Sequence, residues 1–478
     1  MAVLAKVRDM FTPRDMSVGV PWKRIAEFAF PMLVGNFAQQ LYNTVDAVVV
    51  GRSKWGYTAL AAVGNAFPVM MLLLALFVGI ATGAGILVSQ HYGARNKEEL
   101  GKTIGNCISI TAIASLAIMI VGPLVTGPLL KAVGTLPEVY EGCRAYLNIF
   151  FIGIAGFFFY NIFAGVLRGL GDSFSALGFL LICSVLNVVG DILLVDRMGV
   201  AGVALATVIA QLISAALCLI KLRQMNHLFT LSWKSLKPNK ECVMRIVRLG
   251  IPSGLTQVIF SCAMLVVQAL INSFGDALFV ACNVMVMRVD GYAMLPNFSF
   301  GQAMSTYSGQ NVGARRLDRL QVGTRQGIMM AAGTALVMTP LALLFGPTLM
   351  QLFTPGNTEL ISMSMSMMYI IAAGYVAMSV TQCLSGVMRG AGDTVTPMWI
   401  SFGTTIVMRV PLAYALVAMA RRAGATVFAQ ERMIFISLLV AWLVGMVITT
   451  IAYRSGIWKR KQVNRIAAEL AAEASQAA

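Results

Sequence analysis

VLRGLGDSFSAL at residues 166–177 and VMRGAGDTVTPM at residues 387–398 are two copies of one sequence motif. Two further pairs repeat in the same order: RIAEFAFP at 24–31 with RIVRLGIP at 245–252, and GARNKEEL at 93–100 with GARRLDRL at 313–320. The three offsets are 221, 221 and 220 residues. Three matches in register at one spacing indicate an internal duplication, in which the two halves of the chain fold alike.

The composition predicts that both halves lie in a membrane. Of the 478 residues, 58% are hydrophobic and 12% are charged, whereas a soluble domain has about 45–50% apolar and about 25% charged residues. The formal net charge of +16 fits the excess of Lys and Arg that cytoplasmic loops of membrane proteins carry. We therefore expect a lipid bilayer and no nucleic acid as partner.

Twelve segments are long and apolar enough to cross the hydrocarbon core as helices, which takes about 20 residues each. They are residues 25–50, 59–90, 105–130, 145–167, 175–195, 200–222, 250–272, 277–308, 327–353, 362–387, 395–420 and 433–453. The second and the eighth are long, and we expect them to tilt or to extend beyond the bilayer.

The positions of lysine and arginine predict the orientation of these spans. Most of the 36 Lys and Arg residues fall in the two terminal segments and the even-numbered loops, which places both termini in the cytoplasm. The N-terminal segment lacks the apolar core and cleavage site of a signal peptide, so the first span is the insertion signal. The expected order, in the inner (plasma) membrane, is a cytoplasmic segment (1–24), an N-lobe (25–222), a cytoplasmic linker (223–249), a C-lobe (250–453) and a cytoplasmic tail (454–478).

The number of spans per half fixes the symmetry of the repeat. Six is even, so the second half starts on the same side of the membrane as the first, and the repeats are parallel. The predicted fold is an all-α integral membrane protein of twelve transmembrane helices in two six-helix lobes. Transporters built this way bind substrate at the interface of the repeats. We expect a structural role for the RGxGD motifs. Asp172 and Asp393 either cap helices or pair with the arginine of the same motif, Arg168 or Arg389.

Residues for metal or enzyme chemistry are sparse. The eight cysteines are scattered, there are two histidines, and no CxxC or GxxxxGK[ST] motif occurs. The sequence therefore predicts no metal site, no cofactor and no nucleotide site. An intramembrane enzyme would need a His/Asp cluster or a Ser/Lys dyad inside the spans, so we do not expect an enzyme.

Three acidic residues lie well inside the predicted spans: Asp46, Asp191 and Asp290. A charge near the bilayer centre costs at least about 2.5–3.5 kcal/mol, so such residues mark ion or substrate paths. Asp46 and Asp191 lie at one depth in the outer half of the membrane, Asn187 is one turn from Asp191 on the same face, and Thr207 lies at that depth in the next span. Carboxylates, an amide and a hydroxyl together predict an all-oxygen site for a proton or a hard cation such as sodium.

A second intramembrane pair lies near the midplane. Asp290 and Arg409 occupy the middle of the eighth and eleventh spans. The expectation is a buried structural salt bridge between them, with an ion site at Asp290 as the alternative.

The whole chain resembles the multidrug and toxic compound extrusion (MATE) family, and within it the DinF-like branch. The likeness rests on six plus six spans, Pro31 and Pro252 near the start of the first and seventh, GAR after the second and eighth, and RGxGD after the fourth and tenth. The NorM-like branch carries a functional glutamate in its seventh helix. The span 250–272 holds no acidic residue, so a C-lobe sodium site of that kind is not expected.

The resemblance implies roles for particular residues. Asp46, Asn187 and Asp191 correspond to the ion or proton site of the N-lobe, with Tyr146 and Thr207 at its periphery. The implied lining of the substrate cavity is Gln39, Tyr42, Asn161 and Gln257.

The resemblance also implies a mechanism. A proton or sodium gradient, without any cofactor, drives export of small amphipathic, often cationic, drug-like compounds by alternating access of the two lobes of a monomer. One alternative is a lipid-linked sugar flippase of the same broad superfamily, whose cavity is rich in cationic residues. Another is a passive channel, which the asymmetric acidic site disfavours.

Overall fold

The computed structural model describes residues 12–52, 54, 56–132, 135, 137–354 and 356–460, and no strand occurs among them. In the helices, side chains are described except at 43–44, 46–52, 56–65, 67–69, 71–73, 132 and 352–353. The helices of the first half are α2 (Pro21–Arg52), α3 (Gly56–Gly93), α4 (Lys97–Ala132), α5 (Pro137–Ile152), α6 (Ile154–Gly169), α7 (Ser173–Met198) and α8 (Val200–Gln224). Those of the second half are α9 (Lys240–Asn272), α10 (Ala277–Ala293), α11 (Leu295–Gly313), α12 (Leu317–Phe353), α13 (Thr358–Ala372), α14 (Gly374–Gly390), α15 (Val395–Ser401), the π-helix η1 (Phe402–Arg409), α16 (Val410–Arg422) and α17 (Val427–Arg454).

These helices form the twelve predicted spans. Within the described residues, eight stretches are continuous helices long and apolar enough to cross a membrane. Three more spans are helix pairs bent at a break: α5 with α6 by 54°, α10 with α11 by 43°, and α13 with α14 by 49°. The twelfth is α2, which at 32 residues is about 48 Å long but is interrupted by polar residues such as Asn36, Gln39 and Gln40. The two-lobe, twelve-helix fold is confirmed.

The bends of the second half are held by a buried polar cluster. Asn297, just after the break between α10 and α11, is fully buried. Its side-chain amide donates to the backbone carbonyl of Tyr375 at 3.4 Å and accepts from the Ser379 hydroxyl at 2.6 Å. Tyr375 and Ser379 lie in α14, just after the second break. The long eighth span therefore accommodates its length by bending, at a point where polar side chains satisfy groups of the neighbouring bent helix.

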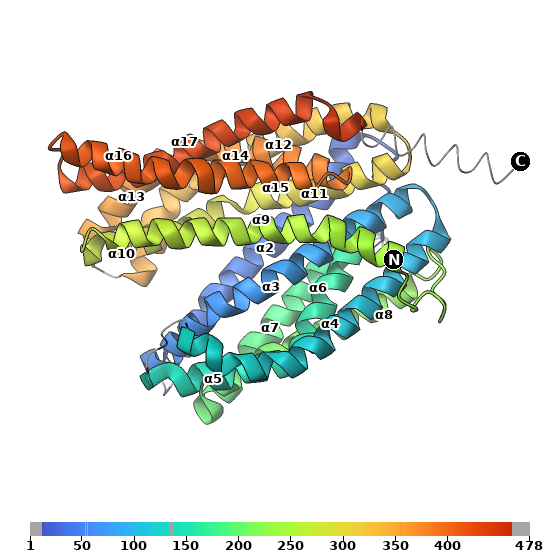
Figure 1. Ribbon diagram of the computed structural model, residues 1–478, viewed down its shortest axis with the longest axis horizontal. Coiled ribbons are helices and arrows are strands. Elements are labelled where there is room, and N and C mark those ends of the chain that lie inside the picture. The colour runs from blue at the N-terminus through green and yellow to red at the C-terminus, as the bar shows by residue number, and fades with distance from the viewer. Residues whose placement is uncertain are drawn as a thin grey trace, which may run out of the picture. The chain divides into compact units, whose positions relative to one another are not determined.

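The chain divides into two compact units. One consists of Phe30–Gly254 with the segment ending at Met16, and the other of Ser17–Ala29 with the chain from Leu255 onward. Both boundaries fall inside long helices, α2 and α9 (Figure 1), next to Pro31 and Pro252. The expected linker, 223–249, belongs to the first unit. Its cytoplasmic placement stays a prediction.

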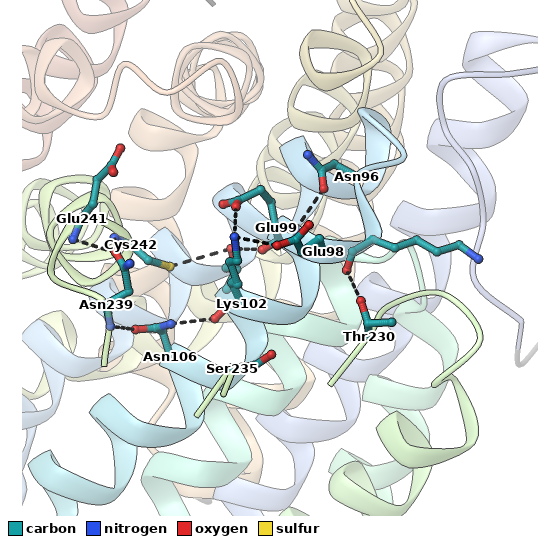
Figure 2. Close-up of polar contacts among 12 residues, drawn as sticks. Asn96, Glu98, Glu99, Lys102, Asn106, Thr230, Ser235, Asn239, Glu241 and Cys242 are labelled. Atoms are coloured by element: carbon teal, nitrogen blue, oxygen red, sulfur yellow. Dashed lines mark hydrogen bonds and ion pairs between the residues drawn. The ribbon is translucent and has the colours of Figure 1, made fainter. Parts of the chain in front are cut away.

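That linker is attached along α4 by several contacts (Figure 2). The Thr230 backbone amide donates to the carbonyl of Lys97 at 3.3 Å, and the Asn239 amide donates to Asn106 Oδ1 at 2.7 Å. A Cβ added to Gly101 of α4 would lie 2.0 Å from the Thr230 carbonyl oxygen. The connection between the halves is thus packed against the first half and is not a free tether.

Both RGxGD motifs form the same turn. Gly171 has φ of 86°, a left-handed conformation that glycine adopts without steric cost. Asp172 then caps α7, since its carboxylate accepts from the Ser175 amide at 2.9 Å and the Ser175 hydroxyl at 2.7 Å. Burial raises the pKa of Asp172, and its bonds to Ser175 and the charge of Lys221, 3.8 Å away, oppose that rise.

The second copy repeats this geometry 221 residues later. Gly392 has φ of 95°, and the Asp393 carboxylate accepts from the Thr396 amide at 3.3 Å and the Thr396 hydroxyl at 2.8 Å. Of the two expected roles for the aspartates, capping is therefore confirmed. Asp172 forms its ion pair with Lys221 of α8, not with Arg168.

Equivalent glycines bring two helices of each half into backbone contact. A Cβ at Gly165 or Gly169 of α6 would lie 2.8 or 2.6 Å from a carbonyl oxygen of α3. A Cβ at Gly386 or Gly390 of α14 would lie 2.2 or 2.1 Å from one of α11. Small residues at such crossings let transmembrane helices approach closely, where van der Waals contact stabilises the packing.

Candidate functional site

Three helices of the first half contribute to one chain of polar side chains. The Tyr42 hydroxyl of α2 donates to Asn187 Oδ1 of α7. Asn187 Nδ2 donates to Thr207 Oγ1 of α8 at 3.2 Å, and the Thr207 hydroxyl donates in turn to the Val203 carbonyl of its own helix at 3.0 Å. Of the side chains expected at one depth from the sequence, Asn187 and Thr207 are in hydrogen-bonding contact.

Local sequence explains why α7 and α8 come close enough for this contact. Gly199, with φ of 60°, is the single residue between the two helices. A Cβ at Gly190 would lie 2.7 Å from the Cβ of Ala206. Two small residues facing each other bring the helix axes together, directly before Asp191 on one helix and directly before Thr207 on the other.

Asp191 lies one helical turn beyond Asn187, and its exposed fraction is 0%. Asn187 is 2% exposed, so the polar face of α7 is turned wholly into the protein. A buried carboxylate is costly in its ionised form, and taking up a proton or binding a cation stabilises it. The arrangement therefore offers a protonatable oxygen pair beside an amide and two hydroxyls.

The other expected members of this site are placed less directly. The side chain of Asp46 lies outside the described residues. Tyr146 of α5 is 6% exposed and packs in an apolar cluster with Val195 and Val203, which lie one turn from Asp191 and Thr207 respectively. Its peripheral position fits the geometry, and its role stays a prediction.

The four residues expected to line a substrate cavity have different environments. Gln39 and Gln257 are exposed, and Tyr42 and Asn161 are half-buried. Asn161 donates to the Phe157 carbonyl of its own helix at 2.8 Å. Their lining role stays a prediction.

In the second half, Asp290 has a different partner from the one expected. The Tyr375 hydroxyl donates to Asp290 Oδ1 at 2.8 Å. Arg409 is near enough to interact electrostatically with Asp290, but the two form no ion pair within 4.0 Å, and Arg409 Nε has no hydrogen-bond partner. The expected direct salt bridge is not formed, and the carboxylate accepts a hydrogen bond from the tyrosine instead.

Sequence reasoning missed two features of this half. Glu431 is 2% exposed, although it lies two residues before the predicted start of its span, because α17 begins earlier, at Val427. Arg389, taken as a turn residue, lines a cavity together with Arg409. Arg409 ends the π-helix η1, and no residue pattern in the sequence predicts that this part of the helix is wider than an α-helix.

Among the described residues no group of three His, Cys, Asp or Glu could hold a metal ion.

Comparison with known proteins agrees with this architecture. The sequence profile of the MatE family matches residues 31–193 and again 252–415. Probable multidrug resistance protein YoeA of Bacillus subtilis is 28% identical over 93% of this chain and 96% of its own length. DNA damage-inducible protein F of Escherichia coli is 26% identical over 70% of this chain and 72% of its own length.

Solved structures show the same fold. An outward-facing multidrug resistance MATE family transporter of the MOP superfamily has a TM-score of 0.86 at 25% identity, over 92% of this chain and 97% of that chain. The family profile covers more than half of the chain and matches once in each half. This chain is a multi-pass membrane protein of the MATE transporter family.

Proposed function

We propose that the protein is a secondary antiporter that exports small amphipathic, often cationic, compounds in exchange for protons or sodium ions. The observation that carries the proposal is Asp191, a fully buried carboxylate one turn from the Tyr42–Asn187–Thr207 chain. Curated relatives named as multidrug resistance proteins support the same class of substrate.

The coupling follows from the chemistry of that site. When the Asp191 carboxylate binds a proton or a sodium ion, its negative charge is neutralised. The neighbouring amide and hydroxyl oxygens can then help to hold the bound ion. When the ion leaves, a buried negative charge remains, which favours either a conformational change or binding of a cationic compound. Ion and substrate then exclude each other energetically, and by linkage each lowers the affinity of the other by the same factor.

No cofactor is needed for this cycle, since the gradient supplies the free energy. We place both termini in the cytoplasm and the chain in the plasma membrane, on the distribution of lysine and arginine. We propose a monomer, because all residues of the polar chain come from one half of one chain.

The test is transport of a cationic dye, ethidium, by purified protein in proteoliposomes. A pH gradient and a sodium gradient are imposed separately, each with an ionophore control that collapses it. Uptake driven by one gradient and abolished by its ionophore supports antiport and identifies the ion. Equal dye flux with and without any gradient contradicts the proposal and indicates a passive pathway.

A further inference from the structure

The second half contains a cavity whose lining combines two arginines with polar and apolar side chains. It lies among α14, α15, η1 and α17, with one side on α9. Its lining residues are Thr256, Phe260, Met378, Thr381, Gln382, Ser385, Arg389, Ile400, Ser401, Thr404, Thr405, Arg409, Leu438, Ala441, Trp442 and Gly445. None of these lining residues is acidic, so the charge facing the cavity is positive.

Neither arginine is neutralised at this site by an ion pair. Arg409 Nε is buried and has no hydrogen-bond partner. The carboxylate nearest to Arg409 is Asp290, which interacts with it only at longer range while accepting a hydrogen bond from Tyr375. For the Arg389 side chain, no hydrogen bond, ion pair or charged neighbour is found among the described residues. Two guanidinium groups that line one cavity without a carboxylate beside them raise the free energy of the empty site.

We propose that this cavity binds the acid group of an amphipathic ligand, a carboxylate or a phosphate. A guanidinium group presents donors in a planar fork that matches both groups bidentately. An anion bound in the cavity neutralises guanidinium charge that no carboxylate of the lining balances. The inference goes beyond the proposed antiport and does not depend on it.

The remaining lining residues define what else the ligand contacts. Thr381 and Thr404 donate their hydroxyl protons to carbonyls of their own helices at 3.0 and 2.8 Å, so they offer acceptors to the cavity. Gln382 carries an amide that can donate to an acid group. Phe260 and Trp442, by contrast, provide aromatic surface that the apolar part of the ligand can contact.

The size of the cavity limits the part of the ligand that enters. Its volume of about 60 Å³ is well below the roughly 300–1,000 Å³ of a pocket for a whole drug-sized molecule. An acid group with a few water molecules fits such a space, while the rest of the ligand remains outside. The π-helix places Arg409 at this cavity, in keeping with the frequent occurrence of π-bulges at functional sites.

The experiment compares two dyes of related ring structure and opposite charge. Purified full-length protein in a neutral detergent is titrated with anionic carboxyfluorescein and, separately, with cationic rhodamine 6G, and binding is followed by fluorescence anisotropy. Arg389→Gln and Arg409→Gln should each weaken carboxyfluorescein binding by roughly 10-fold or more, the effect of losing a hydrogen bond to a charged group. Arg288→Gln, which removes an exposed intramembrane arginine outside the cavity, should leave that affinity within about twofold.

Lysine variants distinguish a binding role from a folding role. Arg409→Lys keeps the charge and removes the planar fork, so it should retain part of the affinity that Arg409→Gln loses. If the wild-type protein does not bind carboxyfluorescein, or if Arg288→Gln weakens it as much as Arg409→Gln, the proposal is overturned. A parallel loss of rhodamine 6G affinity in the arginine variants also overturns it. Because no gradient is applied, failure of this assay leaves the antiport proposal standing, and failure of antiport leaves this one standing.

A lipid arm identifies the source of the acid group. The titration is repeated in nanodiscs of phosphatidylcholine, with and without phosphatidylglycerol. Competition by phosphatidylglycerol assigns the site to an anionic lipid head group. Binding that is unaffected by this lipid assigns it to a soluble acid. Either result supports an anion site, and absence of binding in both membranes refutes it.

Discussion

Asn187 donates a hydrogen bond to the Thr207 hydroxyl at 3.2 Å, from the fifth span to the sixth. Thr207→Val removes this acceptor and keeps the side-chain volume. A hydrogen bond of this kind contributes about 0.5–1.5 kcal/mol, so the concentration of driving ion at half-maximal transport should rise by roughly 2–13-fold. The measurement is dye efflux from proteoliposomes across a series of ion concentrations.

The control for this variant is Thr111→Val in α4. Thr111 is also buried, and its hydroxyl donates only to the Cys107 carbonyl of its own helix at 2.7 Å. Its ion dependence should match that of the wild type. Equal shifts in both variants would mean that Thr207 acts through helix stability and not through the site.

Neutralising Asp191 should abolish gradient-driven efflux. Asp191→Asn keeps the shape of the side chain but can neither ionise nor take up a proton, so the cycle has no charge to couple to the gradient. Asp196→Asn is the matched control, since Asp196 lies on the same helix, is exposed, and accepts a hydrogen bond from the Lys54 amide at 3.1 Å. Wild-type transport by a well-folded Asp191→Asn protein would refute the assignment.

Tyr375 and Asp290 should be energetically coupled. A double-mutant cycle of Tyr375→Phe and Asp290→Asn, read out as Tm in detergent, should show a non-additive term of about 0.5–3 kcal/mol. The cycle of Asp290→Asn with Arg409→Gln should give a smaller term, because no direct ion pair joins those residues. A larger coupling term for Asp290 with Arg409 than for Asp290 with Tyr375 would mean that the direct salt bridge is the dominant contact after all.

The control cycle pairs Asp290→Asn with Tyr307→Phe. Tyr307 is fully buried, and its hydroxyl donates to the Arg319 carbonyl at 2.9 Å. Since Tyr307 makes no contact with Asp290, the Tm changes of this pair should add.

The aspartates of the two RGxGD turns should be interchangeable with asparagine but not with alanine. Asp172→Ala and Asp393→Ala each remove a helix cap, at a cost of about 0.5–2 kcal/mol. Asparagine keeps an oxygen that can accept from the amide three residues on. Thermal unfolding in detergent should therefore show a larger fall in Tm for alanine than for asparagine at both sites, and equal falls would mean that the carboxylate charge is what matters.

The spans were predictable because burial in a bilayer imposes a length and a composition on each of them. Their bends were not. The bend after Met294 depends on Asn297 meeting Tyr375 and Ser379, residues some 80 positions away in the sequence. A contact of that range leaves no local pattern, and the same is true of the π-helix that carries Arg409.

The candidate site shows the same division. Asn187 and Thr207 could be placed at one depth by counting residues from the ends of their spans, and they form a hydrogen bond. For Asp290 the same counting predicted Arg409 as a neighbour, with which it interacts electrostatically, but gave the wrong direct partner, since depth does not determine which neighbour a side chain faces. Arg389 was assigned to a turn because its motif is structural, although its side chain lines a cavity.

Each RGxGD turn is built from a left-handed glycine, an aspartate cap and the first turn of the following helix, and this local geometry is the same in both halves. After the duplication, both copies could therefore keep this turn while other side chains of the two halves diverged in sequence. At the 221-residue offset, Tyr42, Asn187 and Asp191 correspond to Ala263, Met408 and Leu412, while Asp290 and Arg409 correspond to Val69 and Val188. The first half thus carries a buried acid, Asp191, and the second carries Arg409, each at a position whose counterpart is apolar, so the symmetry of the backbone is not a symmetry of these sites.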